Sequence, residues 1–366
     1  MTKIVVVGSG VVGAAIAYEL SQCPDVDLVL LDKQSPAQAA TGAALGVLMG
    51  IISQKTKGRA WRLRHTSIQR FHTLIPELET LTGEPLPVNT DGIVMLLPPD
   101  TDLAKWDALI DLRKQQGWSL ERWSMSEVQE RCPALNPEGA IAAIYSPQDR
   151  QINPSAFTQA LIAGAVHHGA KTQFGVEVIR FETRGTETVI WVRSPDGAEE
   201  AIATDLVIIA AGLGSTPLTE RLHTPVDVRP VLGQAMRVRL PEPLSPNAFH
   251  PVMTAHDIHV VPLGGTEYWV GATVEFPLES GEVIQEVERL EEVWQGAIAL
   301  CPALVNAEIV QTWSGLRPRP FNRSAPIIEA IPGQESIVLA TGHYRNGVLL
   351  APATALMVKE MVQDRG

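Results

Sequence analysis

The chain has 366 residues, of which 45% are apolar and 19% are charged, and its formal net charge is −12. This composition is ordinary for a globular protein, and the excess of acidic residues argues against a nucleic-acid partner. No apolar run approaches the ~20 residues that cross a bilayer, so we expect no membrane span. The length predicts two domains that share a substantial core.

Two further features concern location and redox chemistry. A strand pattern begins at Lys3, close to the first methionine, so we expect no signal peptide and a cytoplasmic location. Three widely spaced cysteines, Cys23, Cys132 and Cys301, are each followed by proline. Their number and spacing argue against a disulfide framework and against a zinc site, so we expect small apolar side chains, buried or half-buried.

The first half of the chain alternates buried strands with helices. Short β-branched runs predict parallel strands, and apolar residues at helical spacing predict the helices between them. Ser124 and Glu127 have the spacing of a capping box, and Asn153 followed by Pro154 is typical of a helix start. The predicted elements are strands at 3–7, 26–31, 172–181, 188–194 and 206–210, and helices at 11–20, 60–78 and 154–169, with a short helix ending near 132.

The second half contains antiparallel material followed by a return to strand and helix. Alternation and turn residues predict strands at 231–240, 256–262 and 267–274, an amphipathic helix at 282–301, a buried strand at 336–340 and a helix at 353–362. The pattern predicts an α/β fold with a Rossmann-like cofactor domain built from discontinuous segments, plus an α+β substrate domain with an antiparallel sheet. We assign 1–85, 147–222 and 311–366 to the first domain, and 86–146 and 223–310 to the second.

A dinucleotide fingerprint, Gly8-Ser9-Gly10-Val11-Val12-Gly13, lies between the first strand and the first helix. Gly8 allows a tight turn, Gly10 lets the backbone approach a pyrophosphate, and Gly13 lets helix and strand pack closely. The phosphates would lie at the helix N-terminus, where free N–H groups favour negative charge. Asp32, 19 residues past Gly13, is placed to bind the hydroxyls of a ribose, which disfavours NADP but leaves NAD and FAD open.

Several longer motifs carry a resemblance to a known family. They are Ala14-Ala15-Ile16-Ala17-Tyr18, Thr41-Gly42-Ala43-Ala44-Leu45-Gly46, Asp205 to Gly212, Gly315-Leu316-Arg317-Pro318 and Gly342 to Thr354. With them, nearly the whole chain resembles the D-amino-acid oxidase superfamily of FAD-dependent amine oxidoreductases, and within it the glycine oxidases. The resemblance implies FAD as the cofactor. No cysteine or histidine stands where related sarcosine oxidases attach their flavin, so we expect the FAD to be noncovalent.

The fingerprint and the resemblance together give a set of expected cofactor contacts. Val178 is implied on the adenine side, and Gly347, Val348 and Leu349 at the pyrimidine edge of the flavin. The expected contacts are Gly8, Gly10, Val11, Val12, Gly13, Asp32, Lys33, Thr41, Gly42, Ala43, Ala44, Gly46, Val47, Val178, Ala211, Gly212, Arg317, His343, Arg345, Asn346, Gly347, Val348 and Leu349.

The resemblance also implies the substrate site. It makes Arg317 the anchor of the substrate carboxylate, which suits a planar guanidinium with two parallel donors. Arg345 is a second candidate near the flavin. His259 stands where glycine oxidases carry a carboxylate-binding tyrosine, and a histidine can still donate a hydrogen bond. His256 and His259 are three apart on a predicted strand and would face opposite sides, so we expect no metal site.

The sequence departs from the family pattern in one further place. Asn322-Arg323-Ser324 replaces the usual Asp-Gly turn, and Glu329 stands where a glycine is common. These departures leave the shape of the loop open, although they do not affect the predicted fold.

The implied activity is FAD-dependent oxidation of glycine, sarcosine or D-alanine to the imine, with oxygen reduced to hydrogen peroxide. The expected partners are a small amino acid and oxygen, and a homo-oligomer is compatible with the sequence. In the family, the product serves thiazole assembly in thiamine synthesis. Three alternatives remain open: a D-amino-acid dehydrogenase that uses another electron acceptor, a sarcosine-type oxidase, and an NAD-binding protein without redox chemistry.

Overall fold

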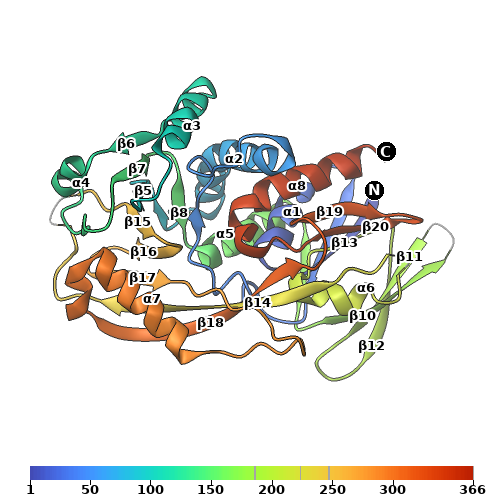
Figure 1. The fold of residues 1–366 in the computed structure, drawn as a ribbon. Coiled ribbons are helices and arrows are strands. Elements are labelled where there is room, and N and C mark those ends of the chain that lie inside the picture. The colour runs from blue at the N-terminus through green and yellow to red at the C-terminus, as the bar shows by residue number, and fades with distance from the viewer. Residues whose placement is uncertain (185–186, 223, 246–247, 366) are drawn as a thin grey trace.

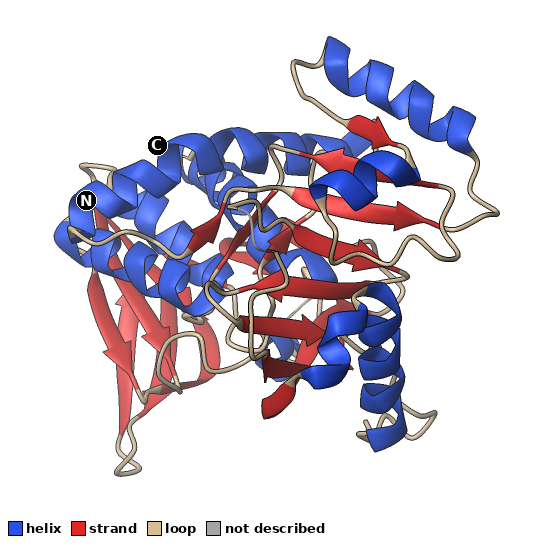
Figure 2. Ribbon diagram, turned by 90° about the vertical axis from the view of Figure 1, so that its left-hand side faces the viewer, coloured by secondary structure: helices blue, strands red, loops and turns tan. Residues whose placement is uncertain are grey.

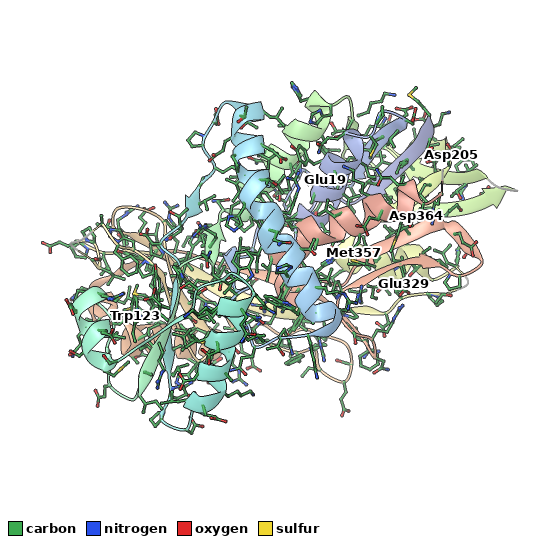
Figure 3. The ribbon with its side chains drawn as sticks, turned by 90° about the horizontal axis from the view of Figure 1, so that it is seen from above. Glu19, Trp123, Asp205, Glu329, Met357 and Asp364 are labelled. Atoms are coloured by element: carbon green, nitrogen blue, oxygen red, sulfur yellow. The ribbon has the colours of Figure 1, made fainter. Side chains whose placement is uncertain are left out.

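Two large sheets dominate the computed structural model, which describes residues 1–184, 187–222, 224–245 and 248–365 (Figure 1). One sheet has six strands in the order β19-β20-β13-β1-β2-β9, and the other has eight in the order β18-β14-β17-β16-β15-β5-β7-β6. Trp123 on β6 and Asp205 beside β13 lie at opposite ends of the molecule when it is seen from above (Figure 3). The α/β fold class is therefore confirmed.

The six-stranded sheet is parallel except at one edge. β1, β2, β13, β20 and β9 run parallel, and β19 pairs with β20 in the antiparallel sense. Its strands are β1 (Thr2–Val7), β2 (Val26–Asp32), β9 (Lys171–Phe174), β13 (Leu206–Ile209), β19 (Ile327–Ile331) and β20 (Gln334–Thr341). The central strands are buried on both faces, which explains their continuous apolar runs.

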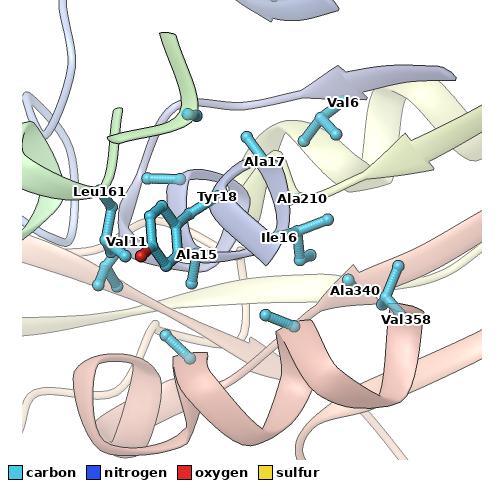
Figure 4. Packing of buried hydrophobic residues seen from close by; sticks show 14 of the residues in the cluster. Val6, Val11, Ala15, Ile16, Ala17, Tyr18, Leu161, Ala210, Ala340 and Val358 are labelled. Carbon is cyan, nitrogen blue, oxygen red and sulfur yellow. The ribbon is translucent and has the colours of Figure 1, made fainter. Parts of the chain in front are cut away.

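Four helices cover one face of this sheet. Figure 4 shows part of the apolar cluster through which they pack. They are α1 (Val11–Ser21), α2 (Gly58–Thr82), α5 (Pro154–His167) and α8 (Gly347–Gln363). Alanines of α1 permit close approach of α8, and Tyr18 packs in the same cluster. The buried Glu19 forms ion pairs with Arg70 of α2 at 2.7 Å and Lys359 of α8 at 3.4 Å. Burial of apolar residues, with this charge satisfied by two partners, therefore fixes the helical layer.

A small antiparallel sheet packs against the opposite face. It consists of β10 (Glu177–Arg184), β11 (Glu187–Arg193) and β12 (Glu199–Thr204). The single strand expected at 172–181 is wrong, because Gly175 adopts a φ of +81° and separates β9 from β10. β9 joins the parallel sheet beside β2, while β10 enters the smaller sheet.

The eight-stranded sheet is largely antiparallel. Its strands are β5 (Ile93–Leu97), β6 (Glu121–Trp123), β7 (Ala142–Ser146), β14 (Val228–Arg239), β15 (Val252–Ala255), β16 (Ile258–Pro262), β17 (Glu267–Gly271) and β18 (Glu308–Pro320). Residues of α4 (Met125–Arg131) and α7 (Val287–Leu300) share an apolar cluster with one face. Figure 2 shows these helices outside the sheet. The other face packs toward residues that follow β2, and it is this face that carries the candidate site.

The remaining elements are short or peripheral. They are β3 (Val47–Leu48), β4 (Val88–Asn89), β8 (Arg150–Ile152), α3 (Leu103–Gln115), α6 (Ser215–Thr219) and the 3₁₀ turns η1 (Gly212–Gly214), η2 (Pro302–Asn306) and η3 (Tyr344–Asn346). Among the helices of the described residues, none combines the length and apolar character that crossing a membrane requires.

The predicted helix caps are confirmed, but two of the predicted helix starts are wrong. The Ser124–Glu127 capping box and the Asn153 N-cap are confirmed. The last helix starts at Gly347 rather than 353, and α7 starts at Val287 rather than 282. Pro352 lies inside α8, where it does not prevent an earlier start. The domain boundaries stay a prediction. One of them, at residue 311, falls within β18.

Candidate active site

The fingerprint loop is too crowded for side chains at two of its glycines. Gly8 has a φ of +109°, and a Cβ there would lie 2.6 Å from the carbonyl oxygen of Ala210 at the end of β13. A Cβ at Gly13 would overlap the carbonyl oxygen of Gly8. The loop is therefore compressed against the ends of β1 and β13, and it leads directly into the N-terminus of α1.

Asp32 connects this loop to the end of β2. Its Oδ2 atom accepts hydrogen bonds from the Ser9 amide at 2.6 Å and the Ser9 hydroxyl at 2.8 Å, and its Oδ1 atom accepts one from the Gln34 amide at 2.9 Å. The carbonyl oxygen of Asp32 accepts from the Val176 amide at 3.0 Å, which brings the start of β10, and with it the buried Val178, near the same strand end. Lys33, the next residue, is exposed.

Thr41 begins the second candidate loop at the first turn of α1. Its hydroxyl accepts a hydrogen bond from the Val11 amide at 3.0 Å, and Thr41 is buried. From there residues 42–47 run to β3, which pairs with β8. This loop therefore extends from the helix terminus that would face a pyrophosphate toward the eight-stranded sheet.

β18 crosses the far end of that loop. The indole N–H of Trp313 donates to the Ala43 carbonyl at 3.1 Å, and a Cβ at Gly315 would overlap the Ala43 side chain. η1, which includes Gly212 and follows Ala211, contacts β18, and so does η3 before α8. Candidate cofactor segments that are far apart in the sequence thus meet along one strand.

The N-terminus of α8 lies at the same place. Asn346 is its N-cap residue and Gly347, Val348 and Leu349 form its first turn, whose amide groups have no partners within the helix. The buried ring of His343 lies 2.9 Å, Nε2 to Oγ1, from Thr354, and only 4% of the residue is exposed. A contact between His343 and a cofactor would therefore involve mainly its backbone.

These segments fit an extended dinucleotide with a flat ring system at one end. The glycine loop, the α1 terminus and Asp32 suit a pyrophosphate and a ribose. Val178 stays a prediction for the adenosine side. Small residues 42–47 and the α8 terminus suit the edge and face of an isoalloxazine. The residues expected to bind FAD are therefore arranged as two ends of one cradle, and the individual contacts remain predictions.

Arg317 lies on β18 with its guanidinium against the backbone of β14. Its Nη1 donates to the Leu232 carbonyl at 2.8 Å, and a Cβ at Gly233 would overlap the guanidinium. Burial, together with the charge of Arg345, holds the pKa of Arg317 below its usual range. One of five guanidinium donors is used by Leu232, which leaves others able to hold an anion.

Arg345 and His259 complete a cationic corner. Arg345 pairs with Asp257 at 2.8 Å (Nη2 to Oδ1), and its hydrogen bonds hold the pKa of Asp257 below its usual range. The Nδ1 atom of His259 is buried and has no hydrogen-bond partner among the described residues. Burial and the charge of Arg345 lower the pKa of His259 to about 4, so this imidazole is neutral near pH 7.

His256 lies differently from the prediction. His256 and Asp257, with φ of 48° and 66°, form the two-residue turn between β15 and β16, so the expected strand begins only at Ile258. The argument from opposite faces of a strand therefore does not apply to His256. No group of three His, Cys, Asp or Glu side chains within the described residues is arranged to hold a metal ion.

A pocket of about 410 Å³ opens beside His259 and Asp257. Its lining includes Met49, Met95 and Trp106, and no motif in the sequence connects these residues with a site. No local motif points to Gly233 either. Its contact with Arg317 joins residues that are 84 positions apart (317 − 233) in the chain.

The two departures of the sequence from the family pattern contact each other. Arg323 pairs with Glu329 at 2.5 Å, and Asn322 adopts a φ of 56°. A left-handed turn residue and an ion pair thus shape the loop before β19 in place of a glycine-containing turn.

Comparisons with known proteins agree with this geometry. Residues 3–361 match the family model described as "FAD dependent oxidoreductase" (DAO). The chain is 27% identical over 367 residues to a glycine oxidase of Geobacillus kaustophilus (strain HTA426), covering 99% of this chain and 93% of the relative. It is 29% identical over 373 residues to the bifunctional protein ThiO/ThiG of Nostoc sp. (strain PCC 7120 / SAG 25.82 / UTEX 2576), covering 100% of this chain and 53% of that protein.

Solved structures show the same likeness. The crystal structure of glycine oxidase from Geobacillus kaustophilus has a TM-score of 0.86 at 26% identity, with 100% of this chain and 95% of that chain covered. The L-proline dehydrogenase from P. horikoshii has a TM-score of 0.85 at 22% identity, covering 99% and 93%, which shows the shared fold. The chain therefore belongs to the FAD-dependent oxidoreductase (DAO) family, and it is an FAD-dependent oxidoreductase.

Proposed function

We propose that this enzyme oxidises glycine, or another small amine-bearing acid such as sarcosine or D-alanine, to the imine and reduces oxygen to hydrogen peroxide. The observation that carries the proposal is the corner formed by Arg317, Arg345 and the neutral His259 beside the α8 terminus. The similarity to glycine oxidases over nearly the whole chain supports the same substrate class.

Arg317 is the proposed anchor of the substrate carboxylate. Its guanidinium is held by the Leu232 carbonyl and lies flat against β14, so the remaining donors have a fixed direction. Arg345 adds a second positive charge, although its pairing with Asp257 reduces its contribution. A bound carboxylate would offset the mutual repulsion of the two cations, which favours an acid over a neutral amine.

His259 is proposed to lie beside the amino group or the carboxylate without adding charge. A neutral imidazole has one donor and one acceptor nitrogen. Because Nδ1 is enclosed by protein, we propose that Nε2 forms the hydrogen bond to substrate. The substrate amine must be neutral to be oxidised, and a neutral histidine does not favour its protonated form as a carboxylate would. Within the proposed site, the side chains mainly bind and orient.

Bound FAD supplies the two-electron acceptor for the Cα–H bond of the oriented substrate. The first-turn amides of α8 would stabilise negative charge that develops on a ring system bound beside them. We propose that the FAD is noncovalent, that the predicted contacts and domain boundaries hold, and that the enzyme is cytoplasmic. A link to thiamine synthesis is proposed from the ThiO/ThiG relatives.

A D-amino-acid dehydrogenase that uses another electron acceptor is the alternative. The two functions differ in the fate of the electrons, which steady-state assays in air can follow. We expect glycine, sarcosine or D-alanine to give continuous peroxide formation coupled to oxygen consumption. Substrate oxidation with an artificial acceptor, but without peroxide in air, would contradict the oxidase proposal and favour the dehydrogenase.

A further inference from the structure

Arg64 is a half-buried arginine of α2 whose charge has no acidic partner within the described residues. Its Nη1 atom donates to the Ala60 carbonyl at 3.0 Å, while its Nε atom is buried and has no hydrogen-bond partner in the described part of the chain. The sequence contains no Asp or Glu between Asp32 and Glu77, so the first half of α2 supplies no counter-charge. Burial lowers the pKa of Arg64. A desolvated cation of this kind is stabilised when negative charge is brought near it.

The guanidinium of Arg64 reaches the N-terminus of α8. Its Nη2 atom donates to Oδ1 of Asn346, the N-cap residue of α8, at 3.3 Å. Three residues further along α2, the buried Ser67 hydroxyl accepts a hydrogen bond from the Ala353 amide at 3.1 Å. The contact between α2 and α8 therefore fixes where the Arg64 charge lies relative to the α8 terminus.

Asn346 does not cap the helix that it precedes. An asparagine at the N-cap position ordinarily accepts a hydrogen bond from the backbone amide two or three residues further on. The Asn346 side chain forms no such bond, and its Oδ1 accepts from Arg64 instead. The first-turn amides of α8, from Gly347 to Leu349, are thus kept free of the side chain that would otherwise occupy one of them.

Free amides and an unpaired cation at one place favour a group that becomes negative. Uptake of two electrons and one proton by a neutral isoalloxazine leaves one negative charge on the ring system. Nearby N–H groups and positive charges stabilise that charge, whereas they act only weakly on the neutral oxidised ring. Groups at the α8 terminus would therefore change the relative stability of the two redox states more than the binding of the oxidised cofactor.

We propose that Arg64 is a positioning residue that favours the reduced flavin over the oxidised flavin. It holds the Asn346 side chain away from the first-turn amides of α8, and it adds its own positive charge to theirs. The inference rests on the part of the proposed function that places the flavin ring at the α8 terminus. It deepens that proposal by naming a residue that sets the reduction potential, whichever amine is oxidised.

The first test compares midpoint potentials of FAD-loaded variants during slow reduction by dithionite in the presence of a reference dye. Arg64→Met should lower the equilibrium constant for reduction about tenfold, which is ~30 mV for a two-electron couple. Arg62→Met is the matched control, because it removes the same charge from an exposed position of the same helix. Its equilibrium constant should stay within about twofold of wild type, since solvent and salt screen an exposed charge. Equal potentials in Arg64→Met and wild type overturn the proposal.

The affinity for oxidised FAD separates this role from a merely structural one. Fluorescence titration of Arg64→Met apoprotein should give a dissociation constant within about threefold of wild type, because the oxidised ring carries no charge. A structural role would weaken the binding of both redox states alike and leave the potential unchanged, which would contradict the proposal. Arg64→Lys keeps the charge and should recover most of the potential. A potential in Arg64→Lys as low as in Arg64→Met overturns the role of the charge.

A double variant tests the diversion of the Asn346 side chain. In Arg64→Met the freed Asn346 can cap α8 and compete for its amides, so adding Asn346→Ala should recover about threefold in the equilibrium constant for reduction. No recovery overturns this part of the proposal. Because dithionite replaces the amine in these measurements, the outcomes stay distinguishable. Flavin that no amino acid reduces refutes the proposed function, whereas an unchanged potential in Arg64→Met refutes only the role of Arg64.

Discussion

Arg317 is a charged side chain that is largely surrounded by protein, and a neighbouring glycine makes that position possible. Its guanidinium occupies the space where a side chain of residue 233 would be, and it is held by the Leu232 carbonyl. Burial lowers its pKa, which is a sign of desolvation that a bound anion would compensate. Both the charge and the space that it occupies can be tested separately.

Removing the charge is the first residue-scale prediction. Arg317→Ala should raise KM for glycine by on the order of 30-fold or more, since losing one partner of a buried charge pair costs ~2–5 kcal/mol. Steady-state peroxide assays measure this change. Arg122→Ala, at an exposed arginine on β6, should keep the wild-type KM. An unchanged KM in Arg317→Ala removes this residue from the substrate site.

The second residue-scale prediction concerns displacement of the Arg317 guanidinium. Gly233→Ala places a methyl group where the Arg317 guanidinium lies, so KM should rise while FAD affinity stays the same. Gly214→Ala is the control, because its Cβ would meet its nearest neighbour at an ordinary 3.5 Å. Fluorescence titration of apoprotein with FAD separates the two effects. A wild-type KM in Gly233→Ala would show that the guanidinium can shift without consequence.

At the scale of elements, the segment from Met49 to Lys55 depends on buried groups from other parts of the chain. Asp149→Ala leaves three amides without their acceptor and should lower the free energy of unfolding by on the order of 3–5 kcal/mol. Urea denaturation measures this difference. Asp100→Ala, at an exposed loop position, should change stability by no more than about 0.5 kcal/mol. Equal stability of the two variants would contradict the account of the segment.

Elements whose signals are local could be predicted from the sequence. The glycine fingerprint, the capping box at Ser124 and the N-cap at Asn153 depend on residues within a few positions of each other. Residues close in the sequence do not predict the split between β9 and β10, because it depends on which sheet each half joins. The prediction of a helix from 353 begins too late, because α8 already starts at Gly347, where packing of Val348 to Ala351 in the core supports the earlier turn.

The residues of the candidate site also differ in whether a local sequence signal identifies them. Arg317, Arg345 and His259 were identified through motifs, and the structure brings them together. Gly233, Met95 and the pocket depend on strand register and long-range packing, for which a single sequence has no local signal.

For the whole molecule, the buried His343 and the half-buried His259 predict a dependence of stability on pH. Burial lowers the pKa of His343 to about 3 and that of His259 to about 4, from an ordinary 6.5. Between about pH 4 and 6.5 the unfolded chain binds protons that the folded chain does not, so stability falls as pH decreases through this window.

Urea midpoints at pH 7, 5.5 and 4.5 measure this slope. Each histidine should contribute up to ~1.4 kcal/mol per pH unit within the window. His343→Gln, which lacks a titrating ring, should show a shallower slope than wild type even if its stability at pH 7 is lower. The same slope in variant and wild type would contradict the assignment of His343 as a buried neutral group.

The whole arrangement, with a cofactor cradle built by distant segments and a cationic corner beside it, serves one proposed reaction. Anaerobic titration of the purified flavoprotein with glycine, sarcosine and D-alanine tests it most directly. The account predicts that at least one of them bleaches the flavin absorbance fully at stoichiometric turnover. Flavin that stays oxidised with all three would contradict the account.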